Sequence, residues 1–186
     1  MKQHSYLALL RGINVGGNNI IKMTALKACF EDMGFSEVKT FIQSGNVIFS
    51  SPEKDLDIIE KNIEKTLSAE FSYTACVVVV SHEMLKAIVT NAPKGFGTKP
   101  VVYRSDVFFV KNQISTKDAV ATIPLNKDVD TAHASAHVIY TTKLISKITR
   151  SRLSKIISLP FYKSLTIRNW NTTTKLLALM EAGDES

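Results

Sequence analysis

The alternation of apolar and polar positions along the first half of the chain predicts short strands and amphipathic helices in a fixed order. An apolar run at residues 5–10 is typical of a buried strand, and residues 23–33 repeat apolar side chains at the spacing of a helix that stops at Gly34. The remaining elements are strands at 39–43 and 47–50 around a Gly45-Asn46 hairpin turn, a helix from Pro52 capped by Ser51, a strand at 75–80 and a helix capped by Ser81. The order is βαββαβ plus a helix.

The second half of the chain repeats this order without repeating the sequence. Its predicted elements are a strand at 107–110, a helix at 115–122, a hairpin of 129–133 with 137–141, a helix at 151–158, a strand at 165–168 and a helix at 171–180. A βαββαβ order is that of the ferredoxin-like fold, so we predict an α+β protein of two ferredoxin-like halves with antiparallel sheets. The predicted domains are residues 1–91 and a basic 105–186, joined by a connection at 92–104.

This topology places two polar clusters. The first two strands of a ferredoxin-like domain run parallel, so the segment RGINVGGNN at residues 11–19 and the turn at 44–46 should lie at the same end of the first sheet. In the second half, residues 150–155 follow the third strand and residues 168–171 end the fourth, so these segments should meet. We expect a cleft between the domains to bring the two clusters together.

Length, composition and charge narrow the class of protein. With 186 residues, 45% hydrophobic and 22% charged, the chain is long enough for one large or two small folded domains. No apolar run is long enough for a membrane span and the first residues lack a signal peptide, so we expect a cytoplasmic protein with no membrane partner. The net charge of +6 is uneven, because residues 131–180 carry Lys and Arg but no acid. We therefore expect an anionic partner.

Arginine is used selectively in this chain. Four of its five arginines, Arg11, Arg150, Arg152 and Arg168, fall inside the two predicted clusters, whereas the eighteen lysines are scattered. A guanidinium group offers a rigid fork of donors that suits phosphate or carboxylate. The ligand is therefore expected to be anionic.

The segment at residues 11–19, which we call the glycine–asparagine loop, is the first candidate site. Gly16 and Gly17 allow positive φ and close backbone approach, while Asn14 and Asn18 add amide donors. Such a loop can cradle an anion, or it can merely turn the chain. Its spacing is neither that of a Walker loop nor GxGxxG, so we assign no cofactor.

Two further segments are candidates in the same sense. Gln43, Ser44 and Asn46 form either a tight turn with incidental polar groups or part of a ligand site, with Gln43 as its main member. Arg152 and Lys155 open a predicted helix, where free amides favour an anion, or they form a solvated basic face.

The segment Arg168-Asn169-Trp170-Asn171 combines a guanidinium group, the single tryptophan and a predicted helix cap at Asn171. Trp170 either packs in the core or offers a stacking face to a base. The four histidines show no metal-ligand arrangement with carboxylates, so we assign no metal site.

The segments RGINVGGNNIIKM, IQSGNVIF, SRLSK and TIRNWNTTTKL resemble the recurrent motifs of the bacterial "domain of unknown function 1697" family, in the same order and across almost the whole chain. The resemblance implies a two-part α/β protein of ferredoxin-like character with no established activity. The family's recurrent polar positions correspond here to Arg11, Asn14, Gly16, Gln43, Ser44, Gly45, Asn46, Arg168, Asn169, Trp170, Asn171, Thr172 and Lys175. Phe41 stands where relatives often have tyrosine, so we do not expect a mechanism that needs a phenol at this position.

Three classes of function follow. The first is a protein that binds a nucleotide or nucleic acid in the interdomain cleft, through the residues Arg11, Asn14, Gly16, Gly17, Asn18, Gln43, Ser44, Asn46, Arg152, Lys155, Arg168, Asn169 and Asn171. The second is an enzyme on a small anionic substrate, for which Asp128 or Asp130 would have to act as the base. The third is a structural or protein-interaction module in which the polar motifs lock the two domains together by side-chain hydrogen bonds. The sequence does not identify the ligand, any reaction or a protein partner.

Overall fold

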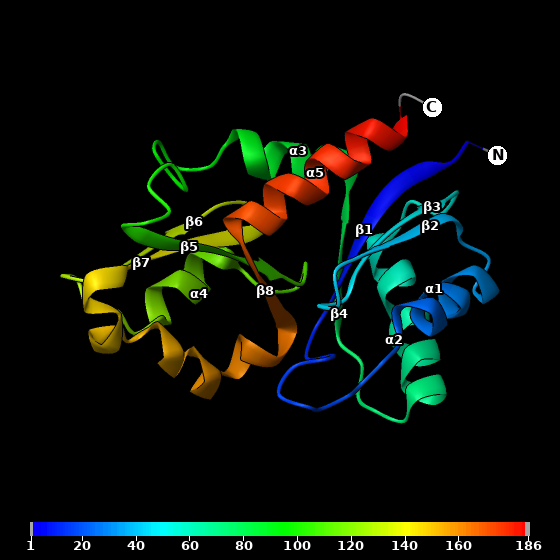
Figure 1. The fold of residues 1–186 in the computed structure, drawn as a ribbon, viewed down its shortest axis with the longest axis horizontal. Helices are drawn as coiled ribbons and strands as arrows, with labels where there is room; N and C mark the ends of the chain where they lie inside the picture. The colour runs from blue at the N-terminus through cyan, green and yellow to red at the C-terminus, as the bar shows by residue number, and fades with distance from the viewer. Residues whose placement is uncertain (1, 185–186) are drawn as a thin grey trace. The chain divides into compact units, whose positions relative to one another are not determined.

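The computed structural model describes residues 2–184 and divides the chain into two compact units (Figure 1). Unit 1 comprises Met1–Leu85 with Leu179–Ser186, and unit 2 comprises Lys86–Ala178. The chain passes from one unit to the other inside two helices, α3 (His82–Thr90) and α5 (Trp170–Asp184).

Unit 1 contains β1 (His4–Leu10), α1 (Met23–Asp32), β2 (Ser36–Phe41), β3 (Asn46–Ser51), α2 (Leu56–Phe71) and β4 (Val77–Ser81). Its antiparallel sheet has the strand order β2-β3-β1-β4. Alternate residues of β1, among them Ala8 and Leu10, pack with α1 and α2 through Phe30 and Ile63, so both helices cover one face of the sheet (Figure 1). This is the predicted ferredoxin-like arrangement.

Two local predictions for unit 1 are wrong. Ser51 does not cap a helix at Pro52, because it pairs with His4 as the last residue of β3, and α2 begins only at Leu56. The cap is Asp55, whose carboxylate accepts hydrogen bonds from the N–H groups of Asp57 and Ile58.

The hairpin turn also differs from its prediction. Asn46 pairs with Phe41 inside the sheet, so the connection is the four residues 42–45 rather than a two-residue Gly45-Asn46 turn. Ile42 and Gly45 both adopt positive φ in it. Ser81, by contrast, caps α3 as predicted, because its hydroxyl accepts a hydrogen bond from the N–H of Met84.

Unit 2 contains β5 (Tyr103–Val110), α4 (Thr116–Thr122), β6 (Asp130–Ala134), β7 (Val138–Leu144), the 3-10 segments η1 (Ile145–Arg150), η2 (Leu153–Ser158) and η3 (Pro160–Ser164), β8 (Leu165–Asn169) and the first part of α5. Its sheet order, β6-β7-β5-β8, is the equivalent of that in unit 1. Phe108, Ile139 and Leu165 pack with Ala119 of α4 and Ile156 of η2 on one face. The predicted α+β class with two ferredoxin-like, antiparallel halves is therefore correct.

Three predictions for unit 2 need correction. Tyr103 and Arg104, predicted as connection, already belong to β5. The helix predicted at residues 151–158 is a 3-10 segment whose buried residues, Leu153 and Ile156, are three apart, which suits three residues per turn. Finally, α5 starts at Trp170 rather than at Asn171, because Asn169 Oδ1 accepts the N–H of Thr172 and caps the helix.

Candidate functional site

The glycine–asparagine loop forms a miniature hairpin. Gly16 and Gly17 adopt φ values of 60° and 78°, and the N–H of Asn18 donates to the carbonyl of Val15 at 3.1 Å. Two successive positive φ values are those of a type I′ turn, which glycine adopts without steric cost. The loop thus has a defined geometry of its own.

Asn14 links this hairpin to the β2–β3 turn. Its Nδ2 donates to the carbonyls of Ile21 at 3.0 Å and Gln43 at 2.9 Å, and its Oδ1 accepts the N–H of Ile21 at 2.8 Å. Gly45 lies so close to β1 that a Cβ there would stand 2.7 Å from Leu10 Cβ. The prediction that the loop and the turn lie at the same end of the first sheet is confirmed.

Most polar groups of this end hold the loop itself together. Asn19 Nδ2 donates to the carbonyl of Gly12 at 2.9 Å, and the completely buried Asn46 donates to Phe41 O and Ser44 Oγ, both at 3.0 Å. The Gln43 and Asn18 side chains are exposed, whereas Arg11 is half-buried. Among the predicted ligand residues of unit 1, Asn14, Ser44 and Asn46 therefore have side chains engaged in structural hydrogen bonds.

The basic segment at residues 150–155 lies at the opposite edge of the second sheet from Asn169. The N–H of Arg152 donates to Asp130 Oδ2 at 2.8 Å, and the carbonyl of Arg150 accepts from Asn126 Nδ2 at 3.1 Å, both beside the start of β6. Because β6 and β8 are the two edge strands and strands are spaced by about 4.8 Å, about 14 Å of sheet lies between them. The prediction that Arg150 and Arg152 meet the end of β8 is wrong.

The predicted base Asp130 is committed to the same structural role. It is 3% exposed, and its Oδ2 accepts N–H groups from Asn126 and Arg152. Asp128 lies in the exposed turn before it. Asp130 therefore serves to hold two segments of backbone.

Arg168 is a buried residue of β8 rather than a surface group. Its Nη1 donates to Thr166 Oγ1 at 2.8 Å and to the carbonyl of Ile167 at 2.9 Å. Burial lowers the pKa of its guanidinium group to about 10, because desolvation disfavours the charged form.

A hollow of about 470 Å³ lies where β5 begins and where β7 and β8 end. We call it the Trp170 hollow, and it is lined by Gly97, Pro100, Tyr103, Arg104, Ser105, Ile145, Ile148, Asn169, Trp170 and Asn171. The end of β8 and the segment after β7 thus meet at this hollow, as the topology predicted. The residues of that segment that line the hollow are Ile145 and Ile148 of η1, and not the predicted basic residues. Of the predicted ligand residues it contains Asn169 and Asn171.

Trp170 packs against neighbouring residues but is not fully buried. The indole meets Phe96 edge to face, with ring centroids 5.0 Å apart, and Phe96 in turn contacts Tyr140 at 5.2 Å. Gly97, with a φ of 74°, approaches the indole so closely that a Cβ would overlap it. The ring is half-buried, and it also lines the hollow.

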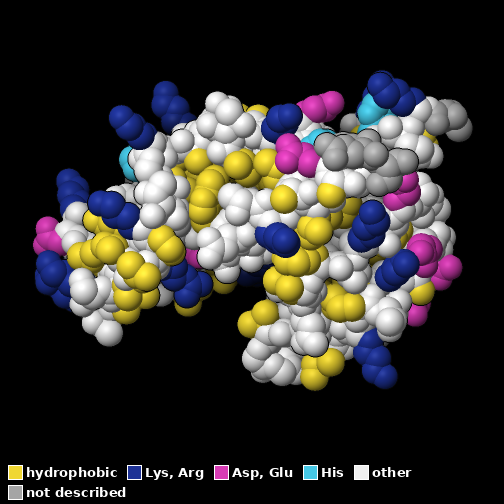
Figure 2. Space-filling model, turned by 45° about the horizontal axis from the view of Figure 1, so that its top comes forward, with side chains coloured by type: hydrophobic (Ala, Val, Ile, Leu, Met, Phe, Trp, Pro, Cys, Tyr) yellow, Lys and Arg dark blue, Asp and Glu magenta, His cyan; other side chains and the backbone are white. Residues whose placement is uncertain are grey.

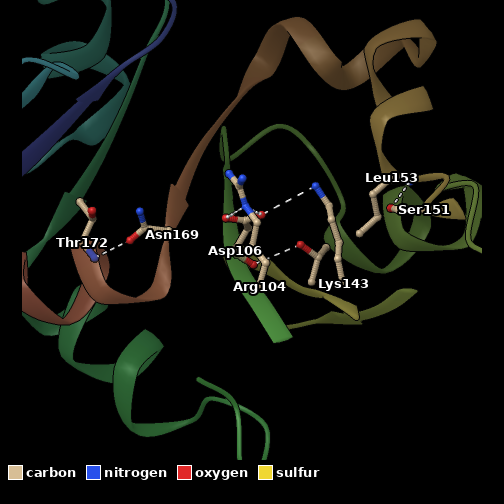
Figure 3. A network of polar contacts seen from close by, with 8 residues as sticks. Arg104, Asp106, Lys143, Ser151, Leu153, Asn169 and Thr172 are labelled. Atoms are coloured by element: carbon tan, nitrogen blue, oxygen red, sulfur yellow. Dashed lines mark hydrogen bonds and ion pairs between the residues drawn. The ribbon is translucent and has the colours of Figure 1, made fainter. Parts of the chain in front are cut away.

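Arg104 is another lining residue of this hollow, and its guanidinium group is paired with a carboxylate. Its Nε lies 3.0 Å from Asp106 Oδ2, and Lys143 Nζ lies 3.9 Å from the same oxygen (Figure 3). The Asp106 side chain is 3% exposed but that of Arg104 is 57% exposed, so the carboxylate lies inside and the guanidinium reaches solvent. Two cations around one carboxylate leave a surplus of positive charge.

Asn169 and Asn171 differ in what their side chains do. Asn169 caps α5 through the N–H of Thr172 at 2.8 Å (Figure 3). The Asn171 side chain is exposed, and among residues 2–184 it has no hydrogen-bond partner. Asn171 is therefore the amide of this hollow that a ligand can use without displacing a structural bond.

The rim of the Trp170 hollow is apolar and basic. Val101, Val102, Ile145 and Ile148 are exposed, and the N–H of Ile145 donates to the carbonyl of Val102 at 2.9 Å, which holds the two segments side by side. Figure 2 shows hydrophobic side chains among Lys and Arg side chains at its left end, over η1 and the start of β5.

Arg104 is the residue that the sequence analysis missed. It is the fifth arginine, the one left outside both predicted clusters, because residues 92–104 were assigned to a connection. The β-formers Val101, Val102 and Tyr103 directly before it were the available evidence that the strand begins earlier.

Among residues 2–184, no helix is long and apolar enough to cross a membrane. Over the same residues, no group of three or more His, Cys, Asp or Glu side chains is arranged to hold a metal ion.

This chain is similar to a solved structure and matches a family model. The solved structure titled "The structure of conserved bacterial protein SP0830 from Streptococcus pneumoniae" is similar to this chain with a TM-score of 0.83 and 23% identity, over 96% of this chain and 99% of that one. A comparison with curated proteins found no match. The family model described as "Protein of unknown function (DUF1697)" matches residues 3–140, which leaves the Trp170 segment outside the matched span. Because the match covers well over half of the sequence, the chain belongs to the DUF1697 family.

Proposed function

We propose that this protein binds a phosphate-bearing ligand of the nucleotide class, and that the ligand occupies the Trp170 hollow of unit 2. The observation that carries the proposal is the combination of an indole, a guanidinium group and an unengaged amide, from Trp170, Arg104 and Asn171, around one hollow. An aromatic face suits a base, and a guanidinium group suits a phosphate.

The size of the hollow supports this class of ligand. Small-molecule sites usually measure about 300–1,000 Å³, and the Trp170 hollow has about 470 Å³. Trp170 and Tyr103 supply flat aromatic surface, and Ile145 and Ile148 supply apolar walls.

Charge supports an anionic ligand over a neutral one. Arg104 and Lys143 share the single carboxylate of Asp106, and residues 131–180 contain no acid to neutralise the other basic groups. An anion that enters the hollow therefore meets net positive potential.

The finer prediction, a cleft between the two domains closed by the glycine–asparagine loop, remains a separate proposal. The hydrogen bonds of Asn14 and Asn19 favour a structural role for that loop within unit 1. Cytoplasmic location is likewise a prediction from the sequence alone.

The single tryptophan makes the proposal testable without a label. We expect adenosine or guanosine monophosphate to quench the fluorescence of Trp170 in a saturable way, because the indole lines the site. Asn171→Ala should weaken binding by about fivefold to tenfold, the value of one hydrogen bond of about 1 kcal/mol. Lys155→Ala, an exposed residue outside the hollow, is the matched control. Equal affinities for both variants and the wild type, or no saturable quenching by any nucleotide, would contradict the proposal.

A further inference from the structure

A second, smaller hollow adjoins the Trp170 hollow on the same sheet. It measures about 230 Å³ and shares Gly97, Tyr103 and Ser105 with its neighbour. We call it the lysine hollow, because Lys94 and Lys99 lie on its wall.

The floor of the lysine hollow is a row of hydroxyl groups. Ser105 pairs with Thr142 across β5 and β7, and Thr142 pairs with Thr131 across β7 and β6. Side chains of paired residues point to the same face of a sheet, and Thr131 Oγ1 lies 2.7 Å from Thr142 Oγ1. Three adjacent strands at about 4.8 Å spacing thus carry a row of hydroxyl groups about 10 Å long, in which one threonine hydroxyl donates to the other.

The wall above this row carries unpaired positive charge. Lys94 and Lys99 are exposed, and within residues 2–184 neither ammonium group has a carboxylate partner. His133 from β6 also lines the hollow, and no acidic residue is among the described lining residues. Ammonium, imidazole and hydroxyl groups are donors suited to phosphate oxygens.

The loop that carries Lys94 and Lys99 packs against Trp170 beside the residues that the two hollows share. Phe96, 9% exposed, contacts both Trp170 and Tyr140, and the turn around it is closed by hydrogen bonds from Thr98 N and Oγ1 to the carbonyl of Gly95. Because Gly97 contacts the indole directly, the loop that carries Lys94 and Lys99 is fixed relative to Trp170.

We infer that the two hollows hold the two ends of one ligand, a nucleoside polyphosphate. Its ring system lies against Trp170 and its phosphate chain follows the hydroxyl row beneath Lys94 and Lys99. A volume of about 230 Å³ is below the roughly 300 Å³ of the smallest usual ligand sites, so the lysine hollow extends its neighbour rather than acting alone. This inference rests on the proposed function and names the ligand class within it.

The test is a phosphate series read by Trp170 fluorescence at constant ionic strength. Adenosine mono-, di- and triphosphate are titrated into the wild type, Lys94→Ala/Lys99→Ala and the control Arg152→Ala/Lys155→Ala, which removes the same charge elsewhere. The wild type and the control should bind the triphosphate at least about tenfold more tightly than the monophosphate, because additional charge-assisted contacts form. In the Lys94/Lys99 variant this advantage should fall below about threefold, with monophosphate affinity unchanged.

The outcomes separate the two proposals. If the monophosphate binds but the triphosphate binds no more tightly in the wild type, the polyphosphate inference is wrong and the proposed function stands. If both double variants lose the advantage equally, the effect is one of net charge and the inference is likewise wrong. If no member of the series binds, the proposed function itself fails. Thermal unfolding of the exposed-lysine variants, expected to match the wild type, verifies that they are folded.

Discussion

The glycine–asparagine loop of unit 1 and the Trp170 hollow of unit 2 are both rich in asparagine, but they use it in different ways. In the loop, Asn14 and Asn19 donate to backbone carbonyls of their own unit. In the hollow, Asn169 is engaged as a helix cap, whereas Asn171 is exposed with no hydrogen-bond partner among residues 2–184. The two sites also lie at different ends of equivalent strands, after the end of β1 in unit 1 and at the start of β5 in unit 2.

This difference shows what a motif of glycine and asparagine can mean. Where the chain must turn through several positive φ values, as at Asn14, Gly16 and Gly17, the amides are consumed by the turn itself. Where a strand leads directly into a helix, as at Asn169, one asparagine side chain is enough for the cap. The second asparagine, Asn171, remains accessible. The following predictions test this division between structural and accessible amides.

The largest effect is expected at Gly97. In Gly97→Ala a Cβ would overlap the indole of Trp170, and the residue would also keep a positive φ, so the free energy of unfolding should fall by about 3 kcal/mol. Gly95→Ala is the matched control, because it has a φ of 79° but its nearest neighbour is Thr98 Oγ1 at 3.8 Å, and it should lose only about 1 kcal/mol. Chemical denaturation followed by Trp170 fluorescence measures both. Equal losses of unfolding free energy in the two variants would show that the packing of the indole does not require glycine at position 97.

The next effect concerns the lock in unit 1. Asn14→Ala removes three side-chain hydrogen bonds, so we expect a loss of about 2 kcal/mol in unfolding free energy and no change in nucleotide affinity. The free energy of unfolding of Asn14→Gly should fall by about 1 kcal/mol less than that of Asn14→Ala, since glycine accepts the φ of 53° without strain. The exposed Gln43→Ala should stay within about 0.5 kcal/mol of the wild type. A folded, fully stable Asn14→Ala that no longer binds nucleotide would reverse the comparison between the two sites.

A smaller change in the free energy of unfolding is expected at alkaline pH. Burial raises the pKa of Tyr73 to about 12 from an ordinary 10.0, so this group contributes stability that is fully present below pH 10.0 and is lost as pH rises toward about 12. The pKa of Arg168 in unit 2 is shifted in the opposite direction, because burial lowers it to about 10.

The variant Tyr73→Phe isolates the contribution of this one residue of unit 1 to the pH dependence of stability. The Tyr73 hydroxyl is buried without a hydrogen-bond partner among the described residues, so its removal should change stability by less than about 0.5 kcal/mol near neutral pH. Above pH 10.0 the variant should lose less stability than the wild type, as measured by denaturant midpoints across the pH range. Parallel pH profiles would show that Tyr73 does not titrate differently in the folded and unfolded chains.

The smallest effect is expected in the basic segment that sequence reasoning favoured. Arg152 and Lys155 have exposed side chains outside both hollows, so alanine at either position should change unfolding free energy by less than about 0.5 kcal/mol and leave monophosphate affinity unchanged. Isothermal titration of the two single variants checks this. If Arg152→Ala lowered nucleotide affinity as much as Asn171→Ala, the prediction of a ligand site in the basic segment would be supported instead.

Much of the fold could be predicted because apolar spacing determines which face of each element is buried. The stripes of α1 and α2 and both strand orders follow from that spacing and from the known topology. Local ambiguity caused the errors. Ser51-Pro52 has the composition of a helix start, but strand pairing with His4 takes precedence over it.

The site was less predictable than the fold because it depends on contacts distant in sequence. Asn169 and Asn171 could be selected from their place between a strand and a helix. Lys94 and Lys99 could not, because their relation to Trp170 depends on how Phe96 and Gly97 pack against the indole. Periodicity contains no information about such a contact.

The account rests on the claim that nucleotides meet this protein at Trp170 and not at the glycine–asparagine loop. Two-dimensional NMR of the isotope-labelled protein during titration with adenosine monophosphate tests it most directly, because it observes both sites in one sample. We predict saturable shifts of the Trp170 indole Nε1–H and of the Asn171 side-chain amide, with the Gly16 and Gly17 amides unmoved. Shifts at Gly16 and Gly17 with an unmoved indole would contradict the account.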